Sequence, residues 1–262
     1  MHPLLFELHF GSLSIPFHTY GLMIAIGFIL GVVTVRRLAR SSGLDPDQCA
    51  DLAFWLLLLG FVGSRALFVL TRFSYFLENP MDVFKVWEGG LVFFGGLISS
   101  TGFAIWYFRK HKLNPWKMVD LLSPGLVIAH AFGRLGCLSA GCCYGKPTGA
   151  PWGIRLESEL VDFSLRGIPL HPTQLYEFVS LMILFAGLIW VFRTKRIDGQ
   201  VGLTYFMVYP IIRSVIEVFR GDAIRGFVVE GLLSTSQFIS ALVFLAALMV
   251  LRFRLKILES KR

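Results

Sequence analysis

Three arginines stand in apolar sequence, where a charged side chain is costly. Arg65, Arg134 and Arg213 are each flanked by hydrophobic residues, and a charge at the centre of a bilayer costs at least about 2.5–3.5 kcal/mol. Such side chains must face a protein interior or a water-filled cavity. A guanidinium group offers a planar fork that matches phosphate oxygens. The arginines therefore predict a site for an anionic headgroup, although snorkelling or an internal ion pair would also satisfy each of them.

Further polar residues stand at helical spacing from two of these arginines. Glu217 and Arg220 follow Arg213 at four and seven residues, so the three share one helical face and Arg213 can pair with Glu217. His130 precedes Arg134 by four residues and shares its face in a regular helix. Such a histidine can take a proton during a reaction, or it can simply pack inside the protein.

The segment 133–145 is rich in glycine and contains three of the four cysteines, Cys137, Cys142 and Cys143. These thiols admit metal binding or redox chemistry. The adjacent pair fits poorly with the separated C-x₂₋₄-C pairs that are usual for zinc, and no C-x-x-C redox motif is present. Packed thiols and a Cys137–Cys142 disulfide stay open as alternatives. We expect no metal and no cofactor.

The composition places these residues in a membrane. Of the 262 residues, 55% are hydrophobic and only 16% are charged, which excludes a disordered chain, a disulfide-stapled mini-protein and a coiled coil. Uncharged runs at Gly89–Phe108 and Gly231–Leu251 are each long enough to span a bilayer, which needs about 20 residues. We predict an all-α polytopic membrane protein with about seven transmembrane helices. The predicted spans are Tyr20–Val35, Asp51–Leu70, Gly89–Phe108, Val119–Gly136, Thr173–Phe192, Val201–Phe219 and Ser234–Leu251.

Lysine and arginine predict the orientation. They concentrate after the first, third, fifth and seventh predicted spans, and the positive-inside rule places these segments in the cytoplasm. The N-terminus is then outside and the C-terminus cytoplasmic. The net charge of +8 needs no nucleic-acid partner, and no cleaved signal peptide is expected. We predict one integral membrane domain over 1–262, with an extracytoplasmic loop or subdomain at 137–172.

Taken together, these residues resemble the prolipoprotein diacylglyceryl transferase family over nearly the whole chain. The resemblance rests on His18-Thr-Tyr-Gly-Leu22, Trp87-Glu-Gly-Gly-Leu-Val-Phe-Phe-Gly-Gly-Leu97, Gly133-Arg-Leu-Gly136, Tyr144-Gly145, His171-Pro-Thr-Gln-Leu-Tyr-Glu177 and Arg213-x-x-x-Glu217-x-x-Arg220. It implies an enzyme of the bacterial cytoplasmic (inner) membrane. Such an enzyme moves the diacylglyceryl group of phosphatidylglycerol to the lipobox cysteine thiol in a prolipoprotein signal peptide, and it releases glycerol phosphate.

The resemblance also implies roles for single residues. Arg134 matches the family arginine that contacts the lipid headgroup, Arg213 a second essential arginine, and Tyr20 an essential tyrosine. We expect both arginines to stabilise the departing phosphate, Glu217 to orient Arg213, and Arg220 to guide the headgroup. The remaining candidates for substrate binding are Arg65, Gly95, Gly96 and Gly145.

This chain departs from the family pattern at two places. Phe94 stands where the family has a histidine that is a candidate base for the thiol. Cys137, Ala140 and Cys142 stand where the family has asparagines and a glutamate. His130 can replace the missing base, since it lies one turn from Arg134. A thiol is also a few per cent ionised at pH 7 without help.

Two other functions stay open at this stage. A protein of the same fold can lipidate a restricted set of acceptors or a different nucleophile. A non-catalytic protein that binds or transports an anionic lipid also uses arginines within the membrane, although no pair of broken helices in matching halves indicates a transporter.

Overall fold

The computed structural model describes residues 4–10, 13–86, 89–221, 226–229 and 233–259. Trp87 and Glu88 of the third motif, and Gly231 at the start of the last uncharged run, lie outside these residues. The helices are α1 (Thr19–Ser41), α2 (Pro46–Thr71), α3 (Phe73–Glu78), α4 (Phe93–Lys110), α5 (Pro115–Ala140), α6 (Thr173–Thr194), α7 (Gln200–Phe219) and α8 (Thr235–Glu259), with short 3-10 turns at Pro80–Phe84 and Phe163–Leu165.

Six of the described helices are long and apolar enough to cross a membrane: α1, α2, α5, α6, α7 and α8. The all-α polytopic class is therefore confirmed. The predicted third span begins too early. Gly89 and Gly90 have φ angles of +88° and +78°, which a right-handed helix does not allow, so α4 begins at Phe93. The number of spans and their orientation stay predictions.

Among the described residues, three small antiparallel strand pairs were not predicted. They are β1 (Leu4–Phe10) with β2 (Leu13–His18), β3 (Ile154–Arg155) with β4 (Pro169–Leu170), and β5 (Phe227–Val229) with β6 (Leu233–Ser234). In the first pair, β2 leads directly into α1, and Leu4 pairs with His18. The four shortest strands, with two or three residues each, leave almost no signal in the sequence. By contrast, β1 and β2 do alternate apolar and polar residues, so this pair could have been predicted.

The chain forms two compact units, residues 35–118 and residues 1–34 with 119–262. In the first unit, α2 and α4 pack closely through glycines. A Cβ atom added to Gly95 would clash with the Gly63 carbonyl oxygen, and one added to Gly96 would lie 2.7 Å from the Gly60 carbonyl oxygen. Ser99 bonds across the same contact, donating to the Leu59 carbonyl at 2.7 Å. Small residues and hydroxyl bonds of this kind are typical of helix pairs in membranes.

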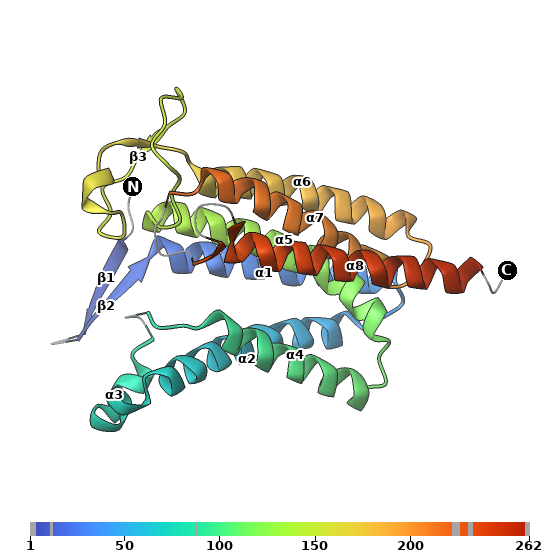
Figure 1. The fold of residues 1–262 in the computed structure, drawn as a ribbon. Coiled ribbons are helices and arrows are strands. Elements are labelled where there is room, and N and C mark those ends of the chain that lie inside the picture. The colour runs from blue at the N-terminus through green and yellow to red at the C-terminus, as the bar shows by residue number, and fades with distance from the viewer. Residues whose placement is uncertain (1–3, 11–12, 87–88, 222–225, 230–232, 260–262) are drawn as a thin grey trace. The chain divides into compact units, whose positions relative to one another are not determined.

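In the second unit, the buried core lies among α5, α6 and α7, while α8 packs on α7 (Figure 1). The first part of α1 lies against α5, because a Cβ atom added to Gly31 would be 2.8 Å from the Gly125 carbonyl oxygen. The core is largely apolar, and its buried members are Val127, Ala131, Leu181, Leu184, Leu188, Val201 and Tyr205.

The loop between α5 and α6 has a small core of its own. Tyr144, Leu156, Val161 and Leu170 are buried against one another beside the β3–β4 pair. Tyr144 also accepts a hydrogen bond at its hydroxyl from the Asp162 backbone N–H at 3.1 Å. The prediction of a subdomain at 137–172, and of a single domain over the whole chain, stays a prediction.

Candidate functional site

Arg134, near the end of α5, binds two partners at once. Its Nη2 lies 3.1 Å from Oε1 of Glu177 on α6, and its Nε donates a 3.2 Å hydrogen bond to Nε2 of His130. Glu177 is only 2% exposed. A buried carboxylate of this kind compensates the guanidinium charge, which lowers the cost of placing Arg134 within an apolar helix. Sequence reasoning did not assign Glu177 a role, although an acidic residue inside a membrane helix is itself a signal.

Arg213 on α7 forms the second ion pair of the site. Its Nη2 lies 2.7 Å from Oε2 of Glu217, which is 3% exposed, so the pairing predicted from their spacing is present. The Nη1 group of Arg213 is buried, and no described residue accepts a hydrogen bond from it. A buried charged donor without an acceptor is costly. An anionic ligand bound here would accept a hydrogen bond from Nη1 and remove this cost.

The two ion pairs meet at His130 and Tyr209. The Tyr209 hydroxyl donates to Glu177 Oε1 at 3.2 Å, and its ring meets the His130 ring edge to face at 5.3 Å. Both guanidinium groups, of Arg134 and of Arg213, act electrostatically on the His130 imidazole. These six residues, Arg134, Glu177, His130, Tyr209, Arg213 and Glu217, are called the arginine cluster below. Its two cations and two carboxylates leave the Nη1 donor of Arg213 available for a phosphate group.

A buried carboxylate from α5 fixes where α7 begins. Asp120 is fully buried, and its Oδ1 accepts the backbone N–H groups of Val201 and Gly202 at 2.8 and 3.1 Å. Its Oδ2 accepts from Gly199 N and from Lys195 Nζ, at 2.8 and 2.7 Å. The first backbone N–H groups of a helix lack internal partners and favour a negative charge. Asp120 thereby holds α7, and with it Arg213, against the helix that carries Arg134; the sequence alone did not indicate it.

Three thiols gather where α5 ends. The Sγ atoms of Cys137, Cys142 and Cys143 all lie within 4.8 Å of one another, and none of the three is in a disulfide. We call them the cysteine trio. Cys142 Sγ donates to the Cys137 carbonyl at 3.7 Å, and the neighbouring thiols together with Arg220 lower the pKa of Cys143.

Tyr20 stands beside both groups. A Cβ atom added to Gly136, one residue before the trio begins, would lie 2.9 Å from the Tyr20 ring, so the ring packs closely against this glycine. Tyr20 is 44% exposed and lies within electrostatic reach of Arg134 and of the cysteine trio. The predicted catalytic residues Arg134, Arg213, Tyr20, His130 and Glu217 thus all belong to one unit of the chain.

Gly145 joins the ends of two helices. Its N–H donates to the His171 carbonyl just before α6, at 3.0 Å, and an added Cβ atom would lie 2.9 Å from the Phe219 carbonyl at the end of α7. Arg220, the next residue after Phe219, pairs with Gly145 in an isolated antiparallel β-bridge. This close backbone approach explains why glycine is required here. A substrate contact by Gly145 stays a prediction.

Arg65, on α2, lies in the other unit and donates to backbone carbonyls of residues 82–90, which precede α4. Nε donates to the Val83 carbonyl at 2.9 Å, and the two terminal nitrogens donate to four more carbonyls. Because a guanidinium group has five N–H donors, this geometry favours a structural role. Gly95 and Gly96 are likewise occupied by packing against α2. Lipid binding by these three residues stays a prediction.

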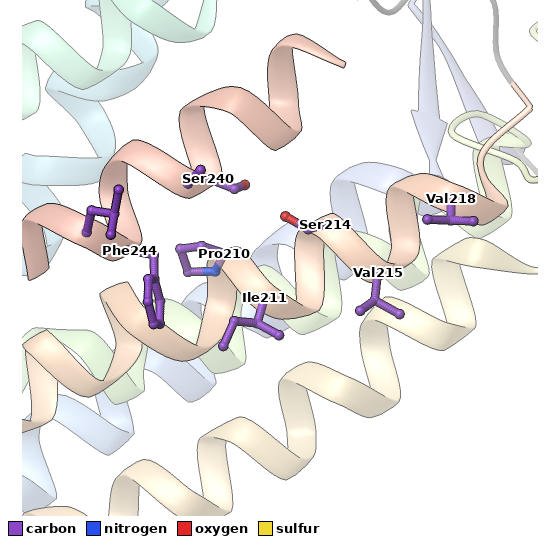
Figure 2. A pocket seen from close by; sticks show the side chains of 9 residues that line it. Pro210, Ile211, Ser214, Val215, Val218, Ser240 and Phe244 are labelled. Atoms are coloured by element: carbon purple, nitrogen blue, oxygen red, sulfur yellow. The ribbon is translucent and has the colours of Figure 1, made fainter. Parts of the chain in front are cut away.

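An apolar groove runs between α7 and α8 (Figure 2). Its walls include Ile211, Val215 and Val218 of α7, together with Phe244 of α8. Each of these α7 positions stands two residues before Arg213, Glu217 or Arg220. Since two residues are about half a helical turn, the groove and the charged residues lie on different faces of α7. With two serines as its only polar side chains, the groove suits hydrocarbon and not a phosphate headgroup.

Comparison with known proteins decides the family. A family model described as "Prolipoprotein diacylglyceryl transferase" matches residues 3–253 of this chain. The chain belongs to the prolipoprotein diacylglyceryl transferase family. The resemblance inferred from the motifs is therefore confirmed.

Curated relatives match the chain over almost all of its length. A phosphatidylglycerol–prolipoprotein diacylglyceryl transferase of Clostridium tetani is 34% identical over 97% of this chain and 99% of the relative. Proteins with the same name from Geobacter sulfurreducens and Bordetella parapertussis are each 35% identical, covering 88% and 91% of this chain, and 88% and 90% of the relatives. With six helices among its described residues that can span a membrane, this family member is a multi-pass protein of a bacterial inner membrane.

Proposed function

We propose that the protein transfers the diacylglyceryl group of phosphatidylglycerol to the lipobox cysteine thiol of a prolipoprotein, with release of glycerol phosphate. The relatives that carry this activity in their names support it. The observation that carries the proposal is the pair of arginine side chains beside His130 and Tyr209, which are only 17% and 14% exposed. One of them, Arg213, keeps a buried donor without an acceptor among the described residues.

The chemistry needs a group that stabilises a departing phosphate. The acceptor sulfur forms a bond to the glycerol carbon while that carbon's bond to a phosphate oxygen breaks, and the electron pair moves to the leaving glycerol phosphate. Donors that are already in place for this charge lower the barrier, and removing one typically costs about 10²–10³ in rate. We assign this role to Arg134 and to Nη1 of Arg213. Bilayer lipid supplies the donor substrate from within the membrane.

The carboxylates act through the arginines. Glu177 and Glu217 are positioning residues, since each holds a guanidinium group in place and offsets its charge. Arg220 receives the headgroup at the edge of the cluster, and Tyr20 borders the place where the acceptor sulfur reacts. Arg65, Gly95, Gly96 and Gly145 remain candidates for lipid contact only.

A role for His130 as general base conflicts with its hydrogen bond. Nε2 of His130 accepts from Arg134 Nε, so the lone pair that would take the thiol proton is already in use. We propose that His130 orients Arg134, and that base catalysis by His130 would require this bond to break.

The transfer is tested with purified protein in vesicles that contain phosphatidylglycerol and a peptide bearing a lipobox cysteine. Mass spectrometry should find the thioether-linked diacylglyceryl peptide. Vesicles of phosphatidylcholine, and a peptide with serine in place of the cysteine, are the controls. Binding of phosphatidylglycerol without transfer to the peptide would contradict the proposal and indicate a non-catalytic lipid-binding protein. Transfer to only some lipobox peptides would indicate a restricted range of acceptors.

A further inference from the structure

The cysteine trio is assembled by a tight reversal of the chain after α5. The helix ends at Ala140, and Gly141 follows with a φ of +78°. Cys142 N then donates back to the Cys137 carbonyl at 3.1 Å. This reversal carries Cys142 and Cys143 back to the last turn of the helix, where Cys137 stands. Four residues lie between Cys137 and Cys142, and Cys142 and Cys143 are adjacent, yet the turn brings all three sulfur atoms together.

Cys143 adopts a backbone conformation that a side chain rarely tolerates. Its φ is +60°, in the left-handed region that favours glycine. Buried side chains of α6 hold it there: Thr173 Oγ1 donates to the Cys143 carbonyl and Gln174 Nε2 to the Cys142 carbonyl, both at 2.7 Å. Backbone strain that neighbours enforce in this way is often found at functional sites. From the sequence, the adjacent Cys142 and Cys143 fitted poorly with a metal site. The unusual backbone at Cys143 removes this objection, because adjacent cysteines can converge on one point only where the chain bends sharply between them.

Three converging thiols fit one metal ion better than they fit a disulfide. An odd number cannot all pair with one another, whereas three thiolates leave one position open on a tetrahedral ion. Sulfur atoms bound to one Zn²⁺ at about 2.3 Å stand about 3.8 Å apart, and the trio spans no more than 4.8 Å. Thiolates are soft ligands that favour Zn²⁺ and Cu⁺ over hard cations. No histidine or carboxylate of the described residues joins the group, so its fourth position is open.

The cysteine trio lies close to residues that we assign to the proposed reaction. Tyr20, Arg134 and Arg220 all interact electrostatically with its sulfur atoms. We propose that Cys137, Cys142 and Cys143 bind one Zn²⁺ ion, and that the open fourth position takes the lipobox thiol of the acceptor. The second part of this inference rests on the proposed function. It gives the thiol an activating group in a chain where Phe94 stands in place of the histidine expected from the family resemblance.

The step balances without an oxidant or reductant. A thiol that coordinates Zn²⁺ loses its proton, which passes to water. The sulfur electron pair forms the bond to the glycerol carbon, and the carbon–oxygen bond to phosphate breaks. Its electron pair stays on glycerol phosphate, which leaves with one more negative charge. The thioether product is a weaker ligand than a thiolate, so it dissociates and the position opens again.

Metal binding is tested directly on the full-length protein in detergent. The protein is reduced, stripped with a chelator without oxygen, and titrated with Zn²⁺ against a chromophoric chelator, while elemental analysis gives the stoichiometry. We expect one Zn²⁺ per chain. Cys137→Ser, Cys142→Ser and Cys143→Ser should each weaken binding by more than the 10–100-fold typical for loss of an outer partner of a metal ligand. Cys49→Ser, on α2 and outside the trio, should bind as the parent does.

A second measurement tests the acceptor position independently of turnover. In Co²⁺-loaded protein, adding the lipobox peptide should strengthen the sulfur-to-cobalt absorption, and the peptide with serine should not. Transfer should be lost on chelation and return with Zn²⁺. Failure of the reduced protein to bind Zn²⁺ would overturn the site. Equal transfer with and without metal would overturn its role. Metal and peptide binding without any transfer would support the site and refute the proposed function instead.

Discussion

Arg134→Lys separates the charge of Arg134 from its geometry. The arginine contacts Glu177 with Nη2 and His130 with Nε at the same time. A lysine keeps the positive charge beside the buried Glu177 but has one nitrogen on a flexible stem, so it cannot reproduce both contacts and still present donors to a phosphate. We therefore expect the variant to fold and to lose most of its transfer rate.

The magnitudes follow from the two contacts. Losing one donor to the developing phosphate charge should lower kcat about 10²–10³-fold, which corresponds to about 2.7–4 kcal/mol. The free energy of unfolding should fall by about 1.5–3 kcal/mol for the lost charged hydrogen bond to His130. Arg134→Gln differs, since it leaves Glu177 buried without its cation, and that typically costs 3–5 kcal/mol.

The assay measures initial rates of thioether formation against phosphatidylglycerol content, which separates kcat from KM, together with thermal unfolding in the same detergent. Arg193→Lys, at an exposed position in the last turn of α6, is the matched control and should behave as the parent. A kcat of Arg134→Lys within threefold of the parent, in a protein that unfolds normally, would refute the assignment of the guanidinium fork to the leaving phosphate.

Three further substitutions test other parts of the structure. His130→Gln should keep transfer within about tenfold, because an amide oxygen can accept from Arg134 Nε; a loss of about 10²–10⁴ would identify His130 as the base instead. Arg65→Lys should lower the free energy of unfolding by at least about 3 kcal/mol in denaturation experiments, since an ammonium group cannot donate hydrogen bonds to all five carbonyls. A smaller loss of stability than that caused by Arg109→Lys, at an exposed position, would contradict the structural role. Asp120→Asn should destabilise the protein by about 3–5 kcal/mol and shift its thermal unfolding, with partial recovery in Asp120→Asn/Lys195→Met; an unchanged midpoint in the single variant would show that Asp120 does not anchor α7.

Local patterns in the sequence determined the helices and one ion pair. Hydropathy placed α6 at 173–192 and α7 at 201–219, within two residues of their observed ends, because a run of apolar residues is a local property. The Arg213–Glu217 pair followed from spacing on a single helix. The motifs around Arg134 and His171 were sufficient for the family, which the comparison with known proteins then confirmed.

Only the tertiary structure decided which polar groups meet. Arg134 finds Glu177 on another helix, and Asp120 caps a helix that begins far along the chain. Both contacts depend on how helices pack, since no local spacing encodes the distance between residues on different helices. Likewise, buried side chains of α6 hold the carbonyls of Cys142 and Cys143 and keep Cys143 in the left-handed conformation. This turn brings together three thiols whose spacing in the sequence argued against a common site.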